Sequence, residues 1–312
     1  MNPWPHKDLI SIHGLSRRQI EFLLHTAASF KDILARPIKK VPSLRGKTVV
    51  NLFVEPSTRT RISFELAATR LSADVLNLDA DNSSFKKGET LLDTAYNLQA
   101  MGTDIVILRH NAAGAAQFLA ERLSSHIINA GDGSHEHPTQ ALRDLFTMQE
   151  RLGTIAGKKV VIIGDILHSR VARSNIHALK LFDAEITLIG PPTLVPREFE
   201  AFDVRVAHRI DPHLYEADVI YLLRVQHERQ RATYFSGLAD YIHLYGITPA
   251  RLARCKPGAI VMHPGPMNRG VEISNEIADG PQSAILDQVK NGIAVRMAVL
   301  YAVGGAIPTL YS

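Results

Sequence analysis

Hydroxyl and guanidinium side chains are concentrated in one short stretch, Ser57-Thr58-Arg59-Thr60-Arg61. The apolar run before it, residues 47–54, predicts a buried strand, and residues 62–71 predict a helix. Pro56 ends the strand and Ser57 is a favourable N-cap, so the first backbone N–H groups of this helix lack helical acceptors. With the helix dipole and the side chains, they favour a site for a phosphate-like anion. The alternative is a capped helix with a solvated basic first turn, but positive charge there opposes the dipole.

Further polar clusters follow expected strands in the same way. They are Arg109, the 131–140 loop with His137 and Gln140, Arg170, Arg224 with Gln226, and the segment 263–269. In open α/β sheets, ligands bind outside the carboxyl ends of the strands. The topology therefore predicts that these clusters converge, although each cation taken alone is an ordinary solvated surface charge.

Predicted strands and helices alternate along the chain. The expected strands are 47–54, 73–78, 104–108, one that ends at 128, 159–163, 185–189, 204–207, 217–223 and 258–262. The expected helices are 16–35, 62–71, 88–101, 139–152, 171–182 and 291–302. This order predicts an α/β protein of two domains, each with a mainly parallel β-sheet flanked by helices, and an active site in the interdomain cleft. We expect one domain at 1–147, with the C-terminal helix 288–312 packing back on it, and the other at 148–287.

Composition excludes several classes of protein. Of the 312 residues, 46% are hydrophobic and 21% charged, as in globular proteins with a sizeable core. The net charge is +4 without a long Lys/Arg block, so we expect no nucleic-acid partner. A single cysteine, Cys255, excludes an intramolecular disulfide. The first residues do not read as a signal peptide, and no apolar run approaches about 18 residues, so we expect a cytoplasmic protein with no membrane partner.

Common cofactor and nucleophile motifs are absent from the sequence. Gly164 follows a strand, but its turn lacks the further glycines of a dinucleotide fingerprint, and there is no P-loop. His135 and His137 are two residues apart without a matching ligand cluster, so we expect no metal. Ser57 lacks the Gly-x-Ser-x-Gly context of an acyl nucleophile. The sequence therefore predicts chemistry by positioning and charge, with no cofactor.

Ordered motifs along the whole chain resemble the aspartate/ornithine carbamoyltransferase family. The family motifs are Ser-Thr-Arg-Thr-Arg at 57–61, His-Pro-Thr-Gln at 137–140 and His-Pro-Gly-Pro at 263–266. Three further segments, 86–90, 224–229 and 268–272, resemble the catalytic chain of its aspartate branch. The ornithine branch typically carries His-Cys-Leu-Pro near the C-terminus and a Ser-Met-Gly loop, and this sequence has neither.

The resemblance implies a reaction and a set of site residues. The reaction transfers the carbamoyl group of carbamoyl phosphate to the amino group of L-aspartate in de novo pyrimidine biosynthesis. The implied carbamoyl-phosphate site is Ser57, Thr58, Arg59, Thr60, Arg109, His137, Gln140, Gly265 and Pro266, of which Arg59, Thr60, Arg109 and His137 are the catalytic residues. The implied aspartate site is Lys87, Arg170, Arg224 and Gln226. Arg61 is left out, because it is expected to brace its loop or pair with Glu55 or Glu89.

The resemblance also implies a homotrimer with shared active sites. Lys87 and a loop serine would come from the neighbouring chain, and the sequence favours Ser84 over Ser83. Two alternatives stay open: a carbamoyltransferase of the ornithine type, and a structural paralogue without activity. A regulatory chain or a dihydroorotase-like partner, and allosteric control, are also left open.

Overall fold

The computed structural model describes residues 4–79, 88–225 and 237–305, and it divides the chain into two compact units. One unit is Met1–Arg143 with Lys290–Ser312, and the other is Asp144–Val289. The chain passes from one unit to the other within α5 (Pro138–Leu152) and again within α11 (Ile285–Gly304). The predicted fold class, two helix-flanked domains with parallel sheets, is confirmed.

The first unit contains a four-stranded sheet in the order β2-β1-β3-β4, with every neighbouring pair parallel. Its strands are β1 (Thr48–Phe53), β2 (Asp74–Asp79), β3 (Ile105–His110) and β4 (His126–Asp132). Its helices are α1 (Arg17–Leu34), α2 (Thr58–Arg70), α3 (Leu91–Ala100) and α4 (Ala115–Ala120). In the register of the two central strands Phe53 lies beside Arg109, so the carboxyl end of β1 adjoins the predicted cation.

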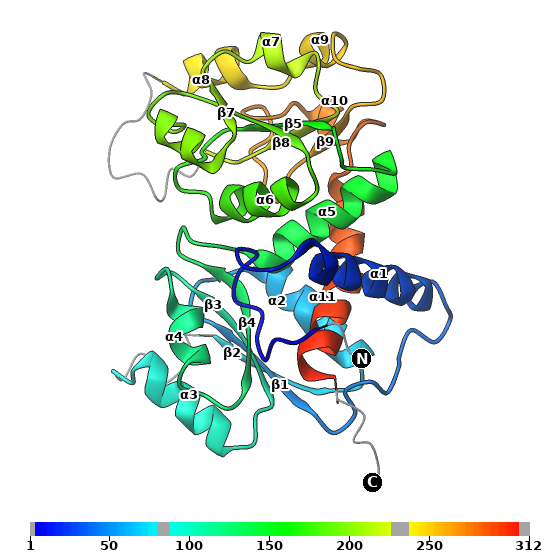
Figure 1. The fold of residues 1–312 in the computed structure, drawn as a ribbon, viewed down its shortest axis with the longest axis vertical. Coiled ribbons are helices and arrows are strands. Elements are labelled where there is room, and N and C mark those ends of the chain that lie inside the picture. The colour runs from blue at the N-terminus through cyan, green and yellow to red at the C-terminus, as the bar shows by residue number, and fades with distance from the viewer. Residues whose placement is uncertain (1–3, 80–87, 226–236, 306–312) are drawn as a thin grey trace. The chain divides into compact units, whose positions relative to one another are not determined.

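Helices cover both faces of this first sheet (Figure 1). Val50, Leu52, Val106 and Leu108 form one buried cluster with side chains of α3 and α4. Because side chains alternate along a strand, the residues between them face the other side, where Ile105 lies against the end of α11. Burial of both faces explains why β1 and β3 read as continuous apolar runs.

The second unit contains a five-stranded parallel sheet in the order β7-β6-β5-β8-β9. Its strands are β5 (Lys159–Ile163), β6 (Glu185–Ile189), β7 (Arg205–Ala207), β8 (Val219–Leu222) and β9 (Ile260–Met262). Its helical elements are α6 (Arg170–Leu181), the 3-10 helix η3 (Arg197–Phe202), α7 (Asp211–Leu214), α8 (Leu238–Tyr245), α9 (Pro249–Leu252) and α10 (Asn275–Ala278). One large apolar cluster joins one face of β5 and β8 to α7, α8 and α10.

Helix ends account for most differences from the expected elements. Helix α1 begins where predicted, because Ser16 and Gln19 form a reciprocal capping box. Helix α3 begins three residues later than expected, because Thr90 accepts from the Asp93 N–H and caps it. The unpredicted elements, α4, η3 and α7 to α10, are no longer than eight residues and too short to show a helical period. In the described part of the chain, no helix is both long enough and apolar enough to cross a membrane.

Candidate active site

The first turn of α2 leaves its backbone donors directed out of the helix. Ser57 occupies the N-cap position, as predicted, but its hydroxyl donates to Oγ1 of Thr60 over 3.0 Å and does not cap the helix. The Arg61 N–H donates to the Ser57 carbonyl over 3.1 Å, so the N–H groups of residues 58–60 precede the helical ladder. Thr60 is buried, whereas Thr58 and Arg59 are exposed. This turn therefore has the geometry of an anion site.

Arg109 is fixed at the carboxyl end of β3 beside this turn. Its Nη2 atom lies 2.6 Å from Oε1 of Glu55, and its Nη1 donates to the Ala130 carbonyl over 3.2 Å. Its own carbonyl accepts from the N–H groups of Val54 and Glu55, at 2.9 and 3.3 Å. The side chain is only 12% exposed. The guanidinium is therefore held on one side by Glu55, in the chain that leads into α2, and on the other by Ala130 of β4.

The loop between β4 and α5 carries His137, and Gln140 follows it in the first turn of α5; both residues are nearly completely buried. The His137 carbonyl accepts from the N–H groups of Gln140 and Ala141, and Pro138 follows as the first helical residue, a favoured position for proline. The loop closely approaches the connection between β3 and α4 at Gly133, where a Cβ atom would lie 2.6 Å from the Ala113 nitrogen. Each of these constraints fixes the backbone next to His137.

His110, the last residue of β3, contacts the same loop through its backbone carbonyl. Its carbonyl accepts from the Gly133 N–H over 2.9 Å, and its Nδ1 accepts from the Ala112 N–H over 2.9 Å. Burial lowers the pKa of His110, against the opposing effect of the Asp132 and Glu55 carboxylates. A lowered pKa leaves the imidazole neutral at pH 7, so its role at this strand end is to accept a hydrogen bond.

In the second unit, Arg170 and Arg224 follow neighbouring strands. Arg170 is the first residue of α6 and is buried, and Ser169 caps this helix by accepting from the Ala172 N–H over 3.1 Å. Arg224 follows β8, and β8 pairs with β5. The two strand ends approach so closely that a Cβ atom at Gly164 would lie 2.5 Å from the Leu223 carbonyl oxygen. Two cations from adjacent strand ends suit a ligand with more than one carboxylate.

The segment after β9 is a tight turn built around a buried histidine. Nδ1 of His263 accepts from the Gly265 N–H over 2.8 Å, so the ring proton lies on Nε2, which faces Oε1 of Glu272 at 3.2 Å. Glu272 also accepts from the Asn268 N–H over 2.5 Å. The Gly265–Pro266 peptide bond is cis, and Pro266 is exposed. One ring thus fixes the backbone whose carbonyls were predicted to bind substrate.

The predicted residues therefore form two groups, one at the carboxyl ends of the strands in each unit. Ser84, Lys87 and Gln226 lie outside the described residues, so their predicted roles stay predictions. The sequence did not single out the side chains that hold the predicted residues in place, among them Asp132, Glu136, Glu272 and, as the partner of Arg109, Glu55. A carboxylate next to a buried strand or turn was the available signal, because such a group must find donors.

Two family models match consecutive parts of the chain. The carbamoyl-P binding domain of aspartate/ornithine carbamoyltransferase matches residues 7–150. The Asp/Orn binding domain of the same family matches residues 156–303. Together the two matches span both units and all the predicted site residues.

Curated relatives and solved structures agree with these matches. The aspartate carbamoyltransferase catalytic subunit of Opitutus terrae is 55% identical over 98% of this chain and 98% of its own length. That of Syntrophotalea carbinolica is 56% identical over 96% of each chain. Aspartate transcarbamoylase from Trypanosoma cruzi in complex with carbamoyl phosphate is 31% identical over 97% of both chains, with a TM-score of 0.89. The chain belongs to the aspartate/ornithine carbamoyltransferase family.

Proposed function

We propose that the chain transfers the carbamoyl group of carbamoyl phosphate to the amino group of L-aspartate, giving N-carbamoyl-L-aspartate and phosphate. The observation that carries this proposal is the end-to-end relationship to aspartate carbamoyltransferase catalytic subunits. The Trypanosoma cruzi neighbour is described in complex with carbamoyl phosphate and aspartate, which supports the same pair of substrates here. In a cell this reaction would serve de novo pyrimidine biosynthesis.

The phosphate of carbamoyl phosphate is assigned to the start of α2. Ser57, Thr58, Arg59 and Thr60 supply hydroxyls, a guanidinium and backbone N–H groups at the positive end of the helix dipole. Because the Ser57 hydroxyl does not cap the helix, it does not compete with phosphate oxygens for these N–H groups. We assign residues 1–147 with 288–312 to the carbamoyl-phosphate-binding domain and residues 148–287 to the aspartate-binding domain.

The carbamoyl oxygen is assigned to Thr60, Arg109 and His137. Negative charge grows on this oxygen when the amine attacks the carbamoyl carbon, and donors fixed in advance stabilise that charge. The fixed geometry of Arg109, between Glu55 and the Ala130 carbonyl, supports this role. The carbamoyl NH₂ needs acceptors, and we assign it to Gln140 and to the carbonyls of Gly265 and Pro266.

Aspartate brings two carboxylates, which we assign to Arg170 and Arg224, together with Gln226 and Lys87. The neutral amine forms the new C–N bond and gives a tetrahedral intermediate, which then breaks the C–O bond to phosphate. The departing phosphate is basic and takes the proton from the amine nitrogen, so His137 needs only to donate a hydrogen bond. Positioning and charge stabilisation carry the catalysis, and no cofactor takes part.

The chain is further proposed to act as a cytoplasmic homotrimer with shared active sites, to which Ser84 and Lys87 come from the neighbouring chain. Whether a regulatory chain or a dihydroorotase-like partner joins the trimer is a separate question, which a sizing measurement with and without such partners answers.

The proposed reaction is tested by supplying carbamoyl phosphate with aspartate or with ornithine and measuring phosphate release. Faster release with ornithine would favour the ornithine-type alternative, and stable assembly without turnover would favour a structural paralogue.

Arg224→Ala is expected to raise the KM for aspartate with little change in kcat or in the KM for carbamoyl phosphate. A hydrogen bond to a charged group is worth about 1.5–3 kcal/mol, so the expected rise in KM is roughly 10- to 100-fold. Steady-state kinetics with each substrate varied in turn measures the effect. Arg209→Ala, which removes an exposed arginine of the same unit, serves as the control. An equal rise in both KM values would contradict the assignment of Arg224 to aspartate.

A further inference from the structure

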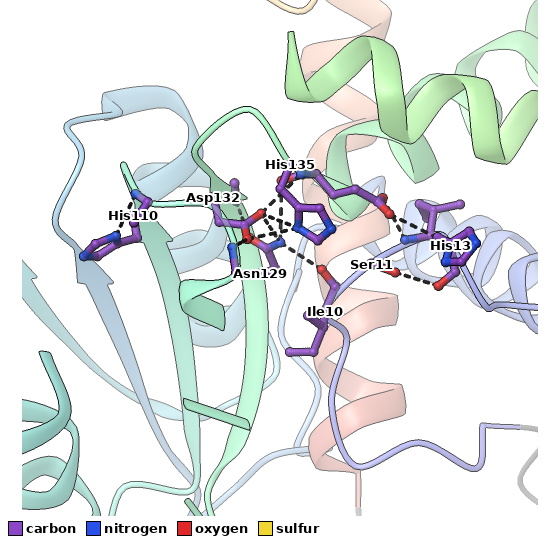
Figure 2. Close-up of polar contacts among 12 residues, drawn as sticks. Ile10, Ser11, His13, His110, Asn129, Asp132 and His135 are labelled. Atoms are coloured by element: carbon purple, nitrogen blue, oxygen red, sulfur yellow. Dashed lines mark hydrogen bonds and ion pairs between the residues drawn. The ribbon is translucent and has the colours of Figure 1, made fainter. Parts of the chain in front are cut away.

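Glu136, the residue before His137, is a buried carboxylate that accepts hydrogen bonds from a part of the chain distant in sequence. It is 2% exposed. Its Oε2 accepts from the Ile12 N–H over 2.8 Å, and its Oε1 accepts from the His13 N–H over 3.2 Å. Figure 2 shows this contact between the loop and the N-terminal segment. Both oxygens are thus used on two consecutive backbone donors, an arrangement that offsets the cost of burying the carboxylate.

The N-terminal segment that donates to Glu136 is itself fixed along β4. Leu9 forms a parallel bridge with Ile128, its N–H donates to the Ile127 carbonyl, and its carbonyl accepts from the Asn129 N–H, both over 2.9 Å. The Asp8 carboxylate accepts from the Ile127 N–H over 2.7 Å. Residues 8–13 therefore form a rigid support that begins on the sheet and ends at Glu136.

A second buried carboxylate, Asp132, holds the loop from its other side (Figure 2). It accepts from the Glu136 N–H over 3.2 Å, from Asn129 Nδ2 over 2.8 Å and from the Gly114 N–H over 2.7 Å. The Asp132 N–H in turn donates to the Glu136 carbonyl over 3.2 Å. The N–H, the carbonyl and the side chain of Glu136 all form hydrogen bonds, which restrict the backbone next to His137.

We propose that Glu136 is a positioning residue that aims His137 at the carbamoyl oxygen by tying the loop to residues 12 and 13. This inference rests on the proposed role of His137 as a donor to that oxygen. Displacement of a catalytic group by about 1 Å can cost roughly 100-fold in rate. A loop released from the N-terminal segment would lose catalytic rate before it lost substrate affinity, because His137 acts mainly on the charge that develops in the transition state.

Glu136→Gln tests this role, because the amide keeps one acceptor oxygen and turns the other into a donor that faces a backbone N–H. The expected result is a kcat lowered about tenfold with a KM for aspartate changed less than about twofold. In a double-mutant cycle, Glu136→Gln should cause no further loss of kcat in the His137→Ala background. A full additional loss in that background would overturn the proposal.

Asp104→Asn is the matched control for a merely structural effect. The Asp104 carboxylate accepts from the Thr48 N–H over 2.9 Å at the opposite, amino-terminal end of the same sheet. This variant should lower the unfolding midpoint and leave kcat unchanged, so an equal loss of kcat in both variants would overturn the positioning role. If Glu136→Gln does not fold, Glu136→Asp, which retracts the carboxylate by one methylene, should show the same split between kcat and KM.

The outcome for His137→Ala separates the two proposals. If His137→Ala lowers kcat and the Glu136 variants do not, the positioning role is wrong and the assigned function stands. If His137→Ala leaves kcat unchanged, the assignment of His137 to the carbamoyl oxygen fails, and the positioning role fails with it.

Discussion

Arg109→Ala is expected to lower kcat by about 100- to 1,000-fold, the usual cost of removing one preorganised oxyanion donor. The effect should be this large because Arg109 is set before the substrate arrives, with Nη2 at 2.6 Å from Glu55 and Nη1 on the Ala130 carbonyl. The measurement is kcat at saturating concentrations of both substrates, with a denaturant unfolding curve to show that the fold is retained.

Two further variants separate the geometry of Arg109 from its charge. Arg109→Lys keeps the charge but loses the planar fork that can reach two oxygens and Glu55 together, so we expect it to restore little activity. Arg122→Ala removes an arginine that lies over the exposed Phe118 ring, and it should leave kcat unchanged. Near-complete activity in Arg109→Lys would contradict the argument, because charge alone would then be sufficient.

Topology made the positions of the candidate residues predictable from the sequence. The apolar runs at 47–54 and 159–163 lead into Ser57 and Arg170, and parallel strands with helical crossovers place all such strand ends at one edge of a sheet. The structure shows Arg109 at the end of β3 and Arg224 after β8, next to strands β1 and β5. Local patterns were sufficient here, because a strand end and the residue after it are close in sequence.

The contacts that orient these residues could not be predicted in the same way. Glu136 binds the N–H groups of Ile12 and His13, which are more than 120 residues away and carry no side-chain signal for the contact. The direction of the Ser57 hydroxyl was also inaccessible, because the N-cap preference fixes the residue type and not its hydrogen-bond partner. Side-chain to backbone bonds across long sequence separations depend on the completed fold.

Asp144→Ala is expected to lower the free energy of unfolding by about 3–5 kcal/mol, among the largest effects of a single substitution. Asp144, on α5, is completely buried and accepts from three side chains of other elements. They are the Tyr221 hydroxyl at 2.5 Å, Gln288 Nε2 at 2.8 Å and Asn175 Nδ2 at 3.1 Å. Each donor left without an acceptor in a dry interior costs about 1–3 kcal/mol, less where the cavity relaxes or admits water.

The network reaches the segment after β9, because Gln288 Oε1 accepts from the His263 N–H over 3.0 Å.

Denaturant unfolding of Asp144→Ala, followed by fluorescence and circular dichroism, measures the loss of stability. Tyr221→Phe removes one donor and leaves the carboxyl group two others, so it should cost only about 0.5–1.5 kcal/mol. The double variant Asp144→Ala/Tyr221→Phe no longer has the unpaired hydroxyl. Its loss of unfolding free energy should therefore be smaller than the sum of the losses in the two single variants. Strict additivity would mean that Asp144 and Tyr221 contribute independently, and that the cost of Asp144→Ala comes from the cavity and not from the orphaned donors.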